Sequence, residues 1–318
     1  MNKKRLYSLV GVLVVVIGIF FGYYYYKNLN PLDMLNDVPI GNVINPPEFK
    51  NFIFGGENNP LVLPLGVAIN SGEVYVSDSD RGQVEVFDYN GKLLRVIGDK
   101  GPGRLNHPYG LAFNGNELYV ADGGWGKILI FEPNGTFKRY FEPKDGVFFS
   151  APSQLVIRDG KIIFPDLALS KVFVFDLDGN LLMTFGQRGE GRGQMIKPHG
   201  VAVDDEGSYY VADSNNNRVL KFNKDGKFVK YLAETADGKP GEILTPRGVA
   251  VDSRNNIYVV SGLGATVYVF NKEGQGLLNF NQLNDEEGNL VLPSGIAIDD
   301  NNKIFVTETT ANRVSVFQ

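Results

Sequence analysis

From residue 49 onward, apolar residues gather in short runs, and the same kind of run recurs at a nearly constant spacing. Six prolines, spaced 44 to 48 residues apart, each open one of these runs: Pro64, Pro108, Pro152, Pro198, Pro246 and Pro293. The openings read PLGVAIN, PYGLAFN, PSQLVIR, PHGVAVD, PRGVAVD and PSGIAID. Their β-branched and aromatic residues predict a β-strand after each proline.

Each unit continues with three more strand-like stretches. In the first and fourth units the second stretch reads VYVSDS and YYVADS, and the third reads QVEVFD and RVLKFN. Several units then close with a run before glycine, such as LLRVIG or LLMTFG. Between the third and fourth stretches lie DYNGK, DLDGN and related sequences, whose Asn-Gly and Asp-Gly pairs favour tight hairpins. Four antiparallel strands in every unit predict an all-β, six-bladed β-propeller of four-stranded blades.

The last unit lacks a fourth stretch, because the sequence ends with the third, RVSVFQ. The stretch FKNFIFGG, at residues 49–56, matches the endings of the other units. We therefore expect a strand within residues 49–55 to complete the last blade and to remove an open sheet edge. The predicted propeller then occupies residues 49–318.

The repeated unit resembles the NHL-repeat family, most closely in KPHGVAVDDEGSYYVADSNNNRVLKF, Lys197 to Phe222. The resemblance extends over residues 49–318 and implies a six-bladed propeller. Some animal members of the family bind RNA on one face through a basic surface. The peptidylglycine amidating lyases, which are enzymes with this fold, hold a metal ion with histidines from several blades.

The N-terminal residues predict a membrane anchor. Leu6 to Tyr26 carry no charge, which suits one transmembrane helix, and the segment follows Lys3, Lys4 and Arg5. A cleaved signal peptide is the alternative, but no small-x-small cleavage site follows the apolar run. We expect residues 1–27 to form a cytoplasmic tip and an uncleaved anchor. Residues 28–48 would form a stalk, and the propeller would lie outside the cell membrane.

Composition narrows the possible partners. The chain has no cysteine, which excludes disulfides, thiolate metal sites and cysteine nucleophiles. It has 31 basic and 36 acidic residues, and four of the basic residues but none of the acidic ones lie in residues 1–27, so the remainder carries a formal charge of −9. An acidic surface is a poor partner for phosphodiester backbones, and we expect no nucleic-acid binding.

The glycine-rich stretch GQRGEGRGQ, at residues 186–194, has two interpretations: a phosphate-binding loop or a connector between blades. A phosphate loop needs a helix N-terminus behind it. Here an inner strand follows, and GDKGPGRLNHP takes the same place in an earlier unit. The pattern favours a connector, with Arg188 and Arg192 at the rim.

Acidic residues end the second strand in four units, at Asp78, Asp122, Asp166 and Asp213. A ring of carboxylates could bind a metal ion. Alternatively, each aspartate caps a turn or pairs with an arginine of a neighbouring blade, such as Arg218 or Arg313. The aspartate recurs with the repeat itself, which favours the second interpretation, and we expect no metal and no cofactor.

No complete catalytic set is present. The two histidines, His107 and His199, are too few for a three-histidine metal site, and Ser170 stands where the amidating lyases would need a histidine. No G-x-S-x-G motif occurs either. We assign no catalytic residue, while a metal-assisted lyase or hydrolase, amidating-lyase-like or lactonase-like, remains the alternative function.

The residues after the opening prolines and the loops after the second strands should meet at one mouth of the central channel. Aromatic, arginine and histidine side chains of this kind suit a binding hot spot. The candidate binding residues are Tyr109, Trp125, His199, Arg247, Arg218 and Arg192. The leading hypothesis is a membrane-tethered scaffold that binds a protein, a peptide or a cell-envelope polymer there.

Overall fold

The structure is a computed structural model that describes residues 45–56, 59–284 and 288–318. Residues Pro46–Gln318 form one compact unit. The predicted anchor and all but the end of the predicted stalk lie outside the described residues. Among the residues that are described, no helix has the length and hydrophobicity that a membrane crossing requires.

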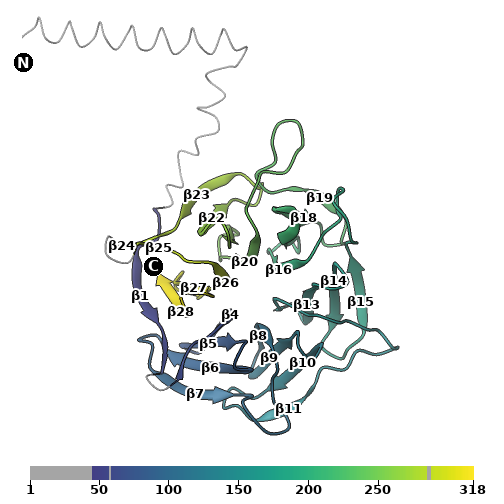
Figure 1. Cartoon of the computed structure of the whole chain (residues 1–318). Coiled ribbons are helices and arrows are strands. Elements are labelled where there is room, and N and C mark those ends of the chain that lie inside the picture. The colour runs from purple at the N-terminus through teal and green to yellow at the C-terminus, as the bar shows by residue number, and fades with distance from the viewer. Residues whose placement is uncertain (1–44, 57–58, 285–287) are drawn as a thin grey trace, which may run out of the picture. The chain divides into compact units, whose positions relative to one another are not determined.

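Six four-stranded antiparallel sheets stand around a central axis, so the predicted all-β propeller is confirmed (Figure 1). From the innermost strand to the outermost, blade 1 consists of β4 (Pro64–Asn70), β5 (Glu73–Asp78), β6 (Gln83–Asp88) and β7 (Leu93–Ile97). Blade 2 consists of β8 (Pro108–Asn114), β9 (Glu117–Asp122), β10 (Lys127–Phe131) and β11 (Phe137–Tyr140). Blade 3 consists of β12 (Val156–Arg158), β13 (Lys161–Asp166), β14 (Lys171–Asp176) and β15 (Leu181–Phe185).

Blades 4 to 6 follow the same order. Their strands are β16 (Pro198–Val203), β17 (Tyr209–Asp213), β18 (Arg218–Phe222) and β19 (Phe228–Tyr231); β20 (Pro246–Val251), β21 (Ile257–Ser261), β22 (Thr266–Phe270) and β23 (Gly276–Phe280); and β26 (Pro293–Ile298), β27 (Ile304–Glu308), β28 (Arg313–Phe317) and β1 (Phe49–Ile53). A short 3-10 helix, η1 (Ser214–Asn216), and the pairs β2 (Gly55–Gly56) with β3 (Asn59–Pro60) and β24 (Gln282–Asn284) with β25 (Gly288–Asn289) lie in the connections.

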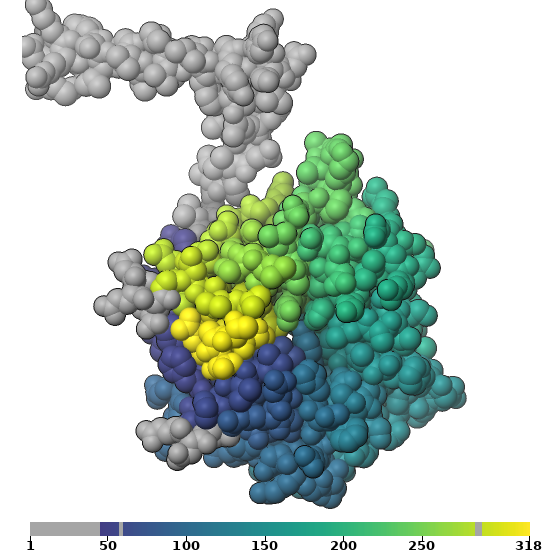
Figure 2. Space-filling model, viewed as in Figure 1, coloured from purple at the N-terminus to yellow at the C-terminus, as the bar shows by residue number. Residues whose placement is uncertain are grey.

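The sixth blade is built from both ends of the propeller. β1 pairs antiparallel with β28, with Phe52 opposite Ser315 and Ile53 opposite Val314. In Figure 2, the yellow C-terminal residues lie beside purple residues near position 50. Because this pairing lies wholly within Pro46–Gln318, that unit contains every strand of the six blades, and we expect it to fold without the preceding residues.

The core lies between neighbouring blades. Tyr75 and Val86 of blade 1, for example, share a buried cluster with Val120 and Leu129 of blade 2. Side chains on a strand alternate between the two faces of its sheet, so each blade contributes to the cluster on either side. The ring is therefore held by a series of apolar layers with no single centre.

Glycine in the Pro-x-Gly openings lets the inner strands approach one another near the axis. A Cβ added to Gly66 would lie 2.0 Å from the carbonyl oxygen of Tyr109, and one added to Gly200 would lie 2.1 Å from that of Arg247. No other residue fits such a contact without moving backbone. The third blade departs from this rule, because Gln154 occupies the glycine position.

The ring has two faces, the mouth face and the opposite face. The mouth face carries the connections into the inner strands and the turns 79–82, 123–126, 167–170, 214–217, 262–265 and 309–312. The opposite face carries the turns from the first to the second strand of each blade, at 71–72, 115–116, 159–160, 204–208, 252–256 and 299–303.

Candidate functional site

The repeated aspartates hold the connections of the mouth face. The buried carboxylate of Asp122 accepts hydrogen bonds from the backbone N–H groups of Asn106 at 2.7 Å and His107 at 3.1 Å. Asp78 receives the N–H groups of Val62 and Leu63 in the same way, both at 3.0 Å. These contacts satisfy buried backbone donors, as turn-capping carboxylates do. Within the described parts of the chain, no three His, Asp or Glu side chains are grouped as a metal site would require.

Arg218 acts inside its own blade. Its Nε lies 2.9 Å from a carboxylate oxygen of Asp213, and its Nη2 donates to the carbonyl oxygens of Gly191 and Gln194, each at 3.0 Å. The side chain is only 7% exposed, and it lies over the ring of Tyr231. The expectation that such an arginine comes from a neighbouring blade is therefore corrected, because the hairpin between β17 and β18 brings this pair together.

The connector GQRGEGRGQ leads from β15 to β16, with no helix between them. The side-chain oxygen of Gln194 accepts a hydrogen bond from the N–H of Gly191 at 2.8 Å. Arg218 also holds this loop, because it donates a hydrogen bond to the carbonyl oxygen of Gly191. The guanidinium carbon of Arg192 lies 5.3 Å from the ring centroid of Phe228, on the outer strand β19. Arg192 thus covers the outer part of blade 4, away from the inner strands.

Three predicted residues meet where the inner strands begin. Tyr109, His199 and Arg247 each follow an opening proline, and all three are half-buried. The rings of Tyr109 and His199 are 6.0 Å apart, and Nδ1 of His199 lies 2.9 Å from the carbonyl oxygen of Lys197. Burial, together with the charge of Arg247, lowers the pKa of His199 to about 4, and burial raises the pKa of Tyr109. Both side chains are therefore neutral at pH 7.

Arg247 carries an uncompensated charge. Among the described arginines that are buried or half-buried, it alone has a guanidinium without a hydrogen bond or an ion pair, and its Nε is buried without a partner. Arg218 and Arg313, by contrast, are paired with Asp213 and Glu308. An unpaired guanidinium next to a neutral imidazole and a neutral phenol can donate hydrogen bonds to an anionic group.

Apolar side chains surround this cluster on the mouth face. The described residues expose eleven large apolar side chains, of which four lie on outer strands and none lies on a turn of the opposite face. The other seven lie on the mouth face: Phe54, Val62, Trp125, Phe148, Leu244, Leu263 and Val291.

The side chain of Trp125 is half-exposed, and hydrogen bonds fix the loop that carries it. Its side chain is 53% exposed, while its indole N–H donates to the carbonyl oxygen of Arg104 at 3.1 Å. Its backbone N–H donates to Asp122 at 3.0 Å. The indole ring is therefore presented to solvent in a set orientation, which lowers the entropy that binding would cost.

Sequence comparison identifies the repeat. The profile of the NHL repeat matches residues 61–87, 196–222 and 290–317. The chain carries NHL repeats. These matches fall on blades 1, 4 and 6, each of which begins with a Pro-x-Gly opening.

Two curated relatives each match the chain over a short stretch. Protein lin-41 of Caenorhabditis elegans is 48% identical over 48 residues, which is 15% of this chain and 4% of that protein. The E3 ubiquitin-protein ligase TRIM71 of Rattus norvegicus is 45% identical over 47 residues, 15% of this chain and 6% of that protein. The matched segments thus cover only a small fraction of these much longer proteins.

Solved structures share the fold. Virginiamycin B lyase from Staphylococcus aureus superposes with a TM-score of 0.59 at 16% identity, over 85% of both chains. A gluconolactonase from Xanthomonas campestris superposes with a TM-score of 0.63 at 19% identity, over 86% of this chain and 94% of that one. At these identities the similarity concerns the architecture alone.

Sequence reasoning missed two features of the NHL propeller. Phe148 and Leu263 lie in connections and turns without a repeated motif, so no pattern marked them as exposed. Gln154 had a visible signal, since it breaks the Pro-x-Gly rule that the other five units keep.

Proposed function

We propose that the mouth face of this propeller recognises a protein or peptide that presents apolar side chains together with a carboxylate. The observation that carries the proposal is the unpaired guanidinium of Arg247, set inside a face that holds seven of the eleven exposed large apolar side chains of the described residues. The partner's carboxylate would meet Arg247, and its apolar groups would cover residues such as Trp125 and Leu263.

Two physical arguments support a protein partner. Exposed apolar groups gathered on one face lose contact with water when a partner covers them, at about 25 cal/mol per Å². Tryptophan, tyrosine and arginine are the residues that most often dominate the energy of protein interfaces. The mouth face offers all three, at Trp125, Tyr109 and Arg247, on connections fixed by buried aspartates such as Asp122.

The test is a selection from a random peptide library against a chain of residues 46–318. We expect enriched peptides to combine aromatic or aliphatic residues with Asp, Glu or a free C-terminal carboxylate. Trp125→Ala and Arg247→Met should each weaken binding of such a peptide by about tenfold or more, since each removes about 1.5–3 kcal/mol.

Leu182→Ala is the matched control, because Leu182 is similarly exposed, at 49% against 53% for Trp125, but lies on the outer strand β15. Its peptide affinity should stay within twofold of the parent chain. Selected peptides that bind both mouth variants as well as the parent would refute the proposal. Purification of the parent chain with a stoichiometric transition metal would instead favour the metal-assisted enzyme.

We further propose that residues 1–27 tether the propeller to the outer side of the cell membrane. The support is the uncharged run Leu6–Tyr26 behind Lys3, Lys4 and Arg5. The full-length chain should stay in the membrane fraction at alkaline pH, and protease added to intact cells should digest the propeller. Release at alkaline pH, or protection from protease, would contradict the tether.

A further inference from the structure

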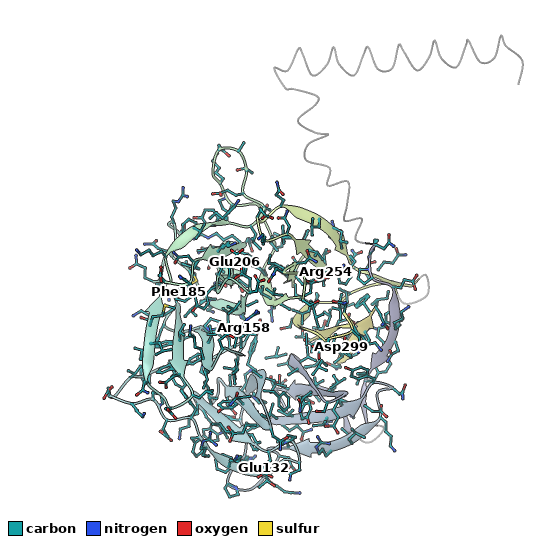
Figure 3. All side chains as sticks on the ribbon, turned by 180° about the vertical axis from the view of Figure 1, so that it is seen from behind. Glu132, Arg158, Phe185, Glu206, Arg254 and Asp299 are labelled. Atoms are coloured by element: carbon teal, nitrogen blue, oxygen red, sulfur yellow. The ribbon has the colours of Figure 1, made fainter. Side chains whose placement is uncertain are left out.

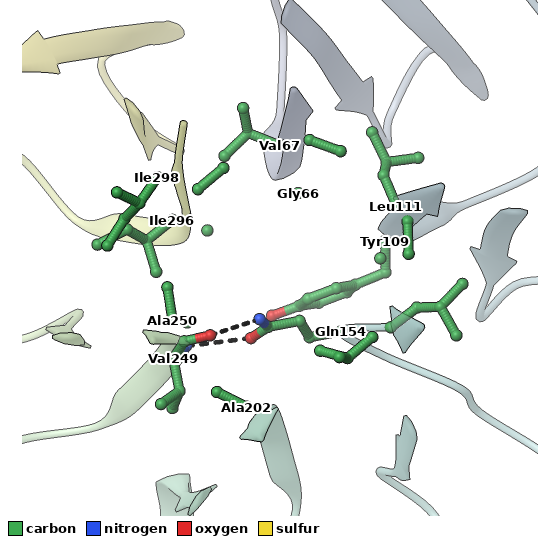
Figure 4. Close-up of a pocket in the computed structure, with 18 of the residues that line it drawn as sticks. Gly66, Val67, Tyr109, Leu111, Gln154, Ala202, Val249, Ala250, Ile296 and Ile298 are labelled. Atoms are coloured by element: carbon green, nitrogen blue, oxygen red, sulfur yellow. Dashed lines mark hydrogen bonds between the residues drawn. The ribbon is translucent and has the colours of Figure 1, made fainter. Parts of the chain in front are cut away.

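A side chain crosses the central channel at the position where the third repeat breaks the glycine rule. The Nε2 of Gln154 donates to the carbonyl oxygen of Val249 at 2.7 Å, and its Oε1 accepts from the N–H of Val249 at 3.1 Å (Figure 4). Gln154 belongs to blade 3 and Val249 to blade 5. The amide passes over Gly200 of blade 4, where an added Cβ would lie 2.7 Å from Oε1.

This contact forms because the inner strand β20 has a free edge that faces the channel. β20 has a strand neighbour on one side only, so the backbone groups on its channel side have no partner strand. A primary amide has the donor and the acceptor of a peptide group, and here it pairs with Val249 as a neighbouring strand would. Gln154 is thereby fixed across the channel.

The ring of Tyr109 extends across the channel next to this amide (Figure 4). We name these two side chains the Gln154–Tyr109 partition. His199 and Arg247 do not line the cavity that the partition borders, whereas the far ends of the inner strands do. The partition therefore lies between the His199 and Arg247 side of the mouth and this cavity, whose lining also includes Leu65 and Ser294 at the mouth end of the inner strands.

This cavity has a volume of about 410 Å³; most of the side chains that line it are apolar, while polar atoms make up nearly half of its exposed surface. Its lining includes Val67, Leu111, Phe113, Val251, Ile296 and Ile298. Phe113, Val251 and Ile298 are only half-buried, so the cavity is open to solvent at its far end. For comparison, an apolar cavity of about 150 Å³ suffices to bind benzene.

One cationic side chain lines the cavity. Arg158 ends the inner strand β12 and lies close to the central axis when the ring is seen from behind (Figure 3). Its Nη1 donates to the carbonyl oxygen of Val203 at 2.8 Å, which orients the guanidinium across the junction of blades 3 and 4. Its nearest carboxylate, that of Asp159, is 4.0 Å from Nε and 83% exposed, so it compensates the charge weakly.

We propose that this cavity binds a small amphipathic carboxylate, with its apolar chain in the channel and its carboxylate at Arg158. An apolar pocket with few polar groups is the usual form of a small-molecule site. The partition borders the pocket on one side of the channel, and Arg158 fixes the polar end of the ligand at the far opening. The site shares Tyr109 with the mouth face, but it does not rest on the function proposed there.

The test is a titration of decanoate into residues 46–318 carrying labelled methyl groups, followed by NMR. We expect saturable 1:1 binding that shifts the methyl signals of Leu111, Ile296 and Ile298. The methyls of Leu94 and Leu182, exposed on outer strands, serve as controls and should not move. Shifts at Leu244 and Leu263 instead, or no saturation, would overturn the proposal, and this readout needs no variant.

Variants then test the carboxylate. Arg158→Met should weaken decanoate binding by about tenfold or more, the loss expected for one charged hydrogen bond, and should leave decanol binding nearly unchanged. Equal affinity of the parent chain for decanoate and decanol would overturn the assignment of the carboxylate. Trp125→Ala should bind decanoate like the parent, so that failure of this site and failure of the mouth face can be told apart.

Discussion

The guanidinium carbon of Arg313 lies 3.9 Å from the ring centroid of Phe52, and this contact joins β28 to β1 within the sixth blade. Arg313 also pairs with Glu308 of β27 at 2.8 Å, so three strands of the blade meet around one side chain. Phe52 itself lies 4.6 Å from the ring of Phe49, measured between centroids. The closing strand is thus bound by aromatic contacts as well as by its backbone.

Phe52→Ala should lower the free energy of unfolding by about 2 kcal/mol, less than the loss at a fully buried phenylalanine because Phe52 is half-buried. Urea denaturation followed by circular dichroism measures the change. Phe148→Ala is the control: its ring is 68% exposed, and the expected loss is within about 0.5 kcal/mol. Equal losses in the two variants would argue against a stabilising role for the closing strand.

Gly200→Ala should destabilise the propeller by about 1–3 kcal/mol, the usual cost of inserting a methyl group into a packed site. The new Cβ would lie 2.1 Å from the carbonyl oxygen of Arg247, so the inner strands of blades 4 and 5 must move apart. Gly276→Ala is the matched control, since a Cβ there meets nothing within 4 Å. Thermal unfolding of both variants measures the loss of stability, and an unchanged midpoint for Gly200→Ala would contradict the packing argument.

His199 should stay neutral well below the pH at which an ordinary histidine gains a proton. Its pKa of about 4 in the folded state lies below the ordinary value of 6.5, so the unfolded chain binds more protons between these values. The His199 contribution to stability is therefore complete above pH 6.5 and is lost as the pH falls toward 4. His199→Gln should lose less stability than the parent chain between pH 6.5 and pH 4, as measured by urea denaturation.

The same histidine reports on Arg247. Because the charge of Arg247 is the second cause of the low pKa, Arg247→Met should raise the pKa of His199, which an NMR titration of the imidazole measures directly. The pKa should remain below 6.5, since burial is the larger cause. No change in the titration would mean that the guanidinium does not face the imidazole.

Gln154→Glu should destabilise the chain at pH 7 by about 1–3 kcal/mol, because a carboxylate oxygen replaces the amide donor and leaves the carbonyl of Val249 without its partner. Gln187→Glu is the control: it makes the same change of charge on an exposed connector and should alter stability by less than about 0.5 kcal/mol. If both substitutions cost the same, the hydrogen bonds to Val249 contribute nothing measurable.

The repeated pattern made the blades predictable, because local turn chemistry and strand alternation determine a propeller unit. Asn-Gly and Asp-Gly place the hairpins, and the proline openings place the inner strands. The same pattern also indicated that Asp122 caps its own connection. These features depend on residues close in sequence or repeated at a fixed spacing, which periodicity can detect.

Pairing between side chains was harder to predict. Arg218 and Arg247 look alike in the sequence, yet the first is paired with Asp213 and the second has no partner among the described residues. The difference arises because Asp213 ends the strand that pairs with the one Arg218 begins, whereas Arg247 follows an opening proline. Gln154 spans two blade interfaces, and only the three-dimensional ring brings it to Val249.

The order of synthesis gives the sixth blade a further role. β26, β27 and β28 are made after the other strands of the propeller, and β1, their outer partner, leaves the ribosome before any complete blade exists. The pairing of β1 with β28 joins the two blade strands that lie farthest apart in the sequence, and such long-range contacts form slowly. Until β28 is made, β1 presents an unpaired edge, which is a site where the nascent chain can pair with another copy.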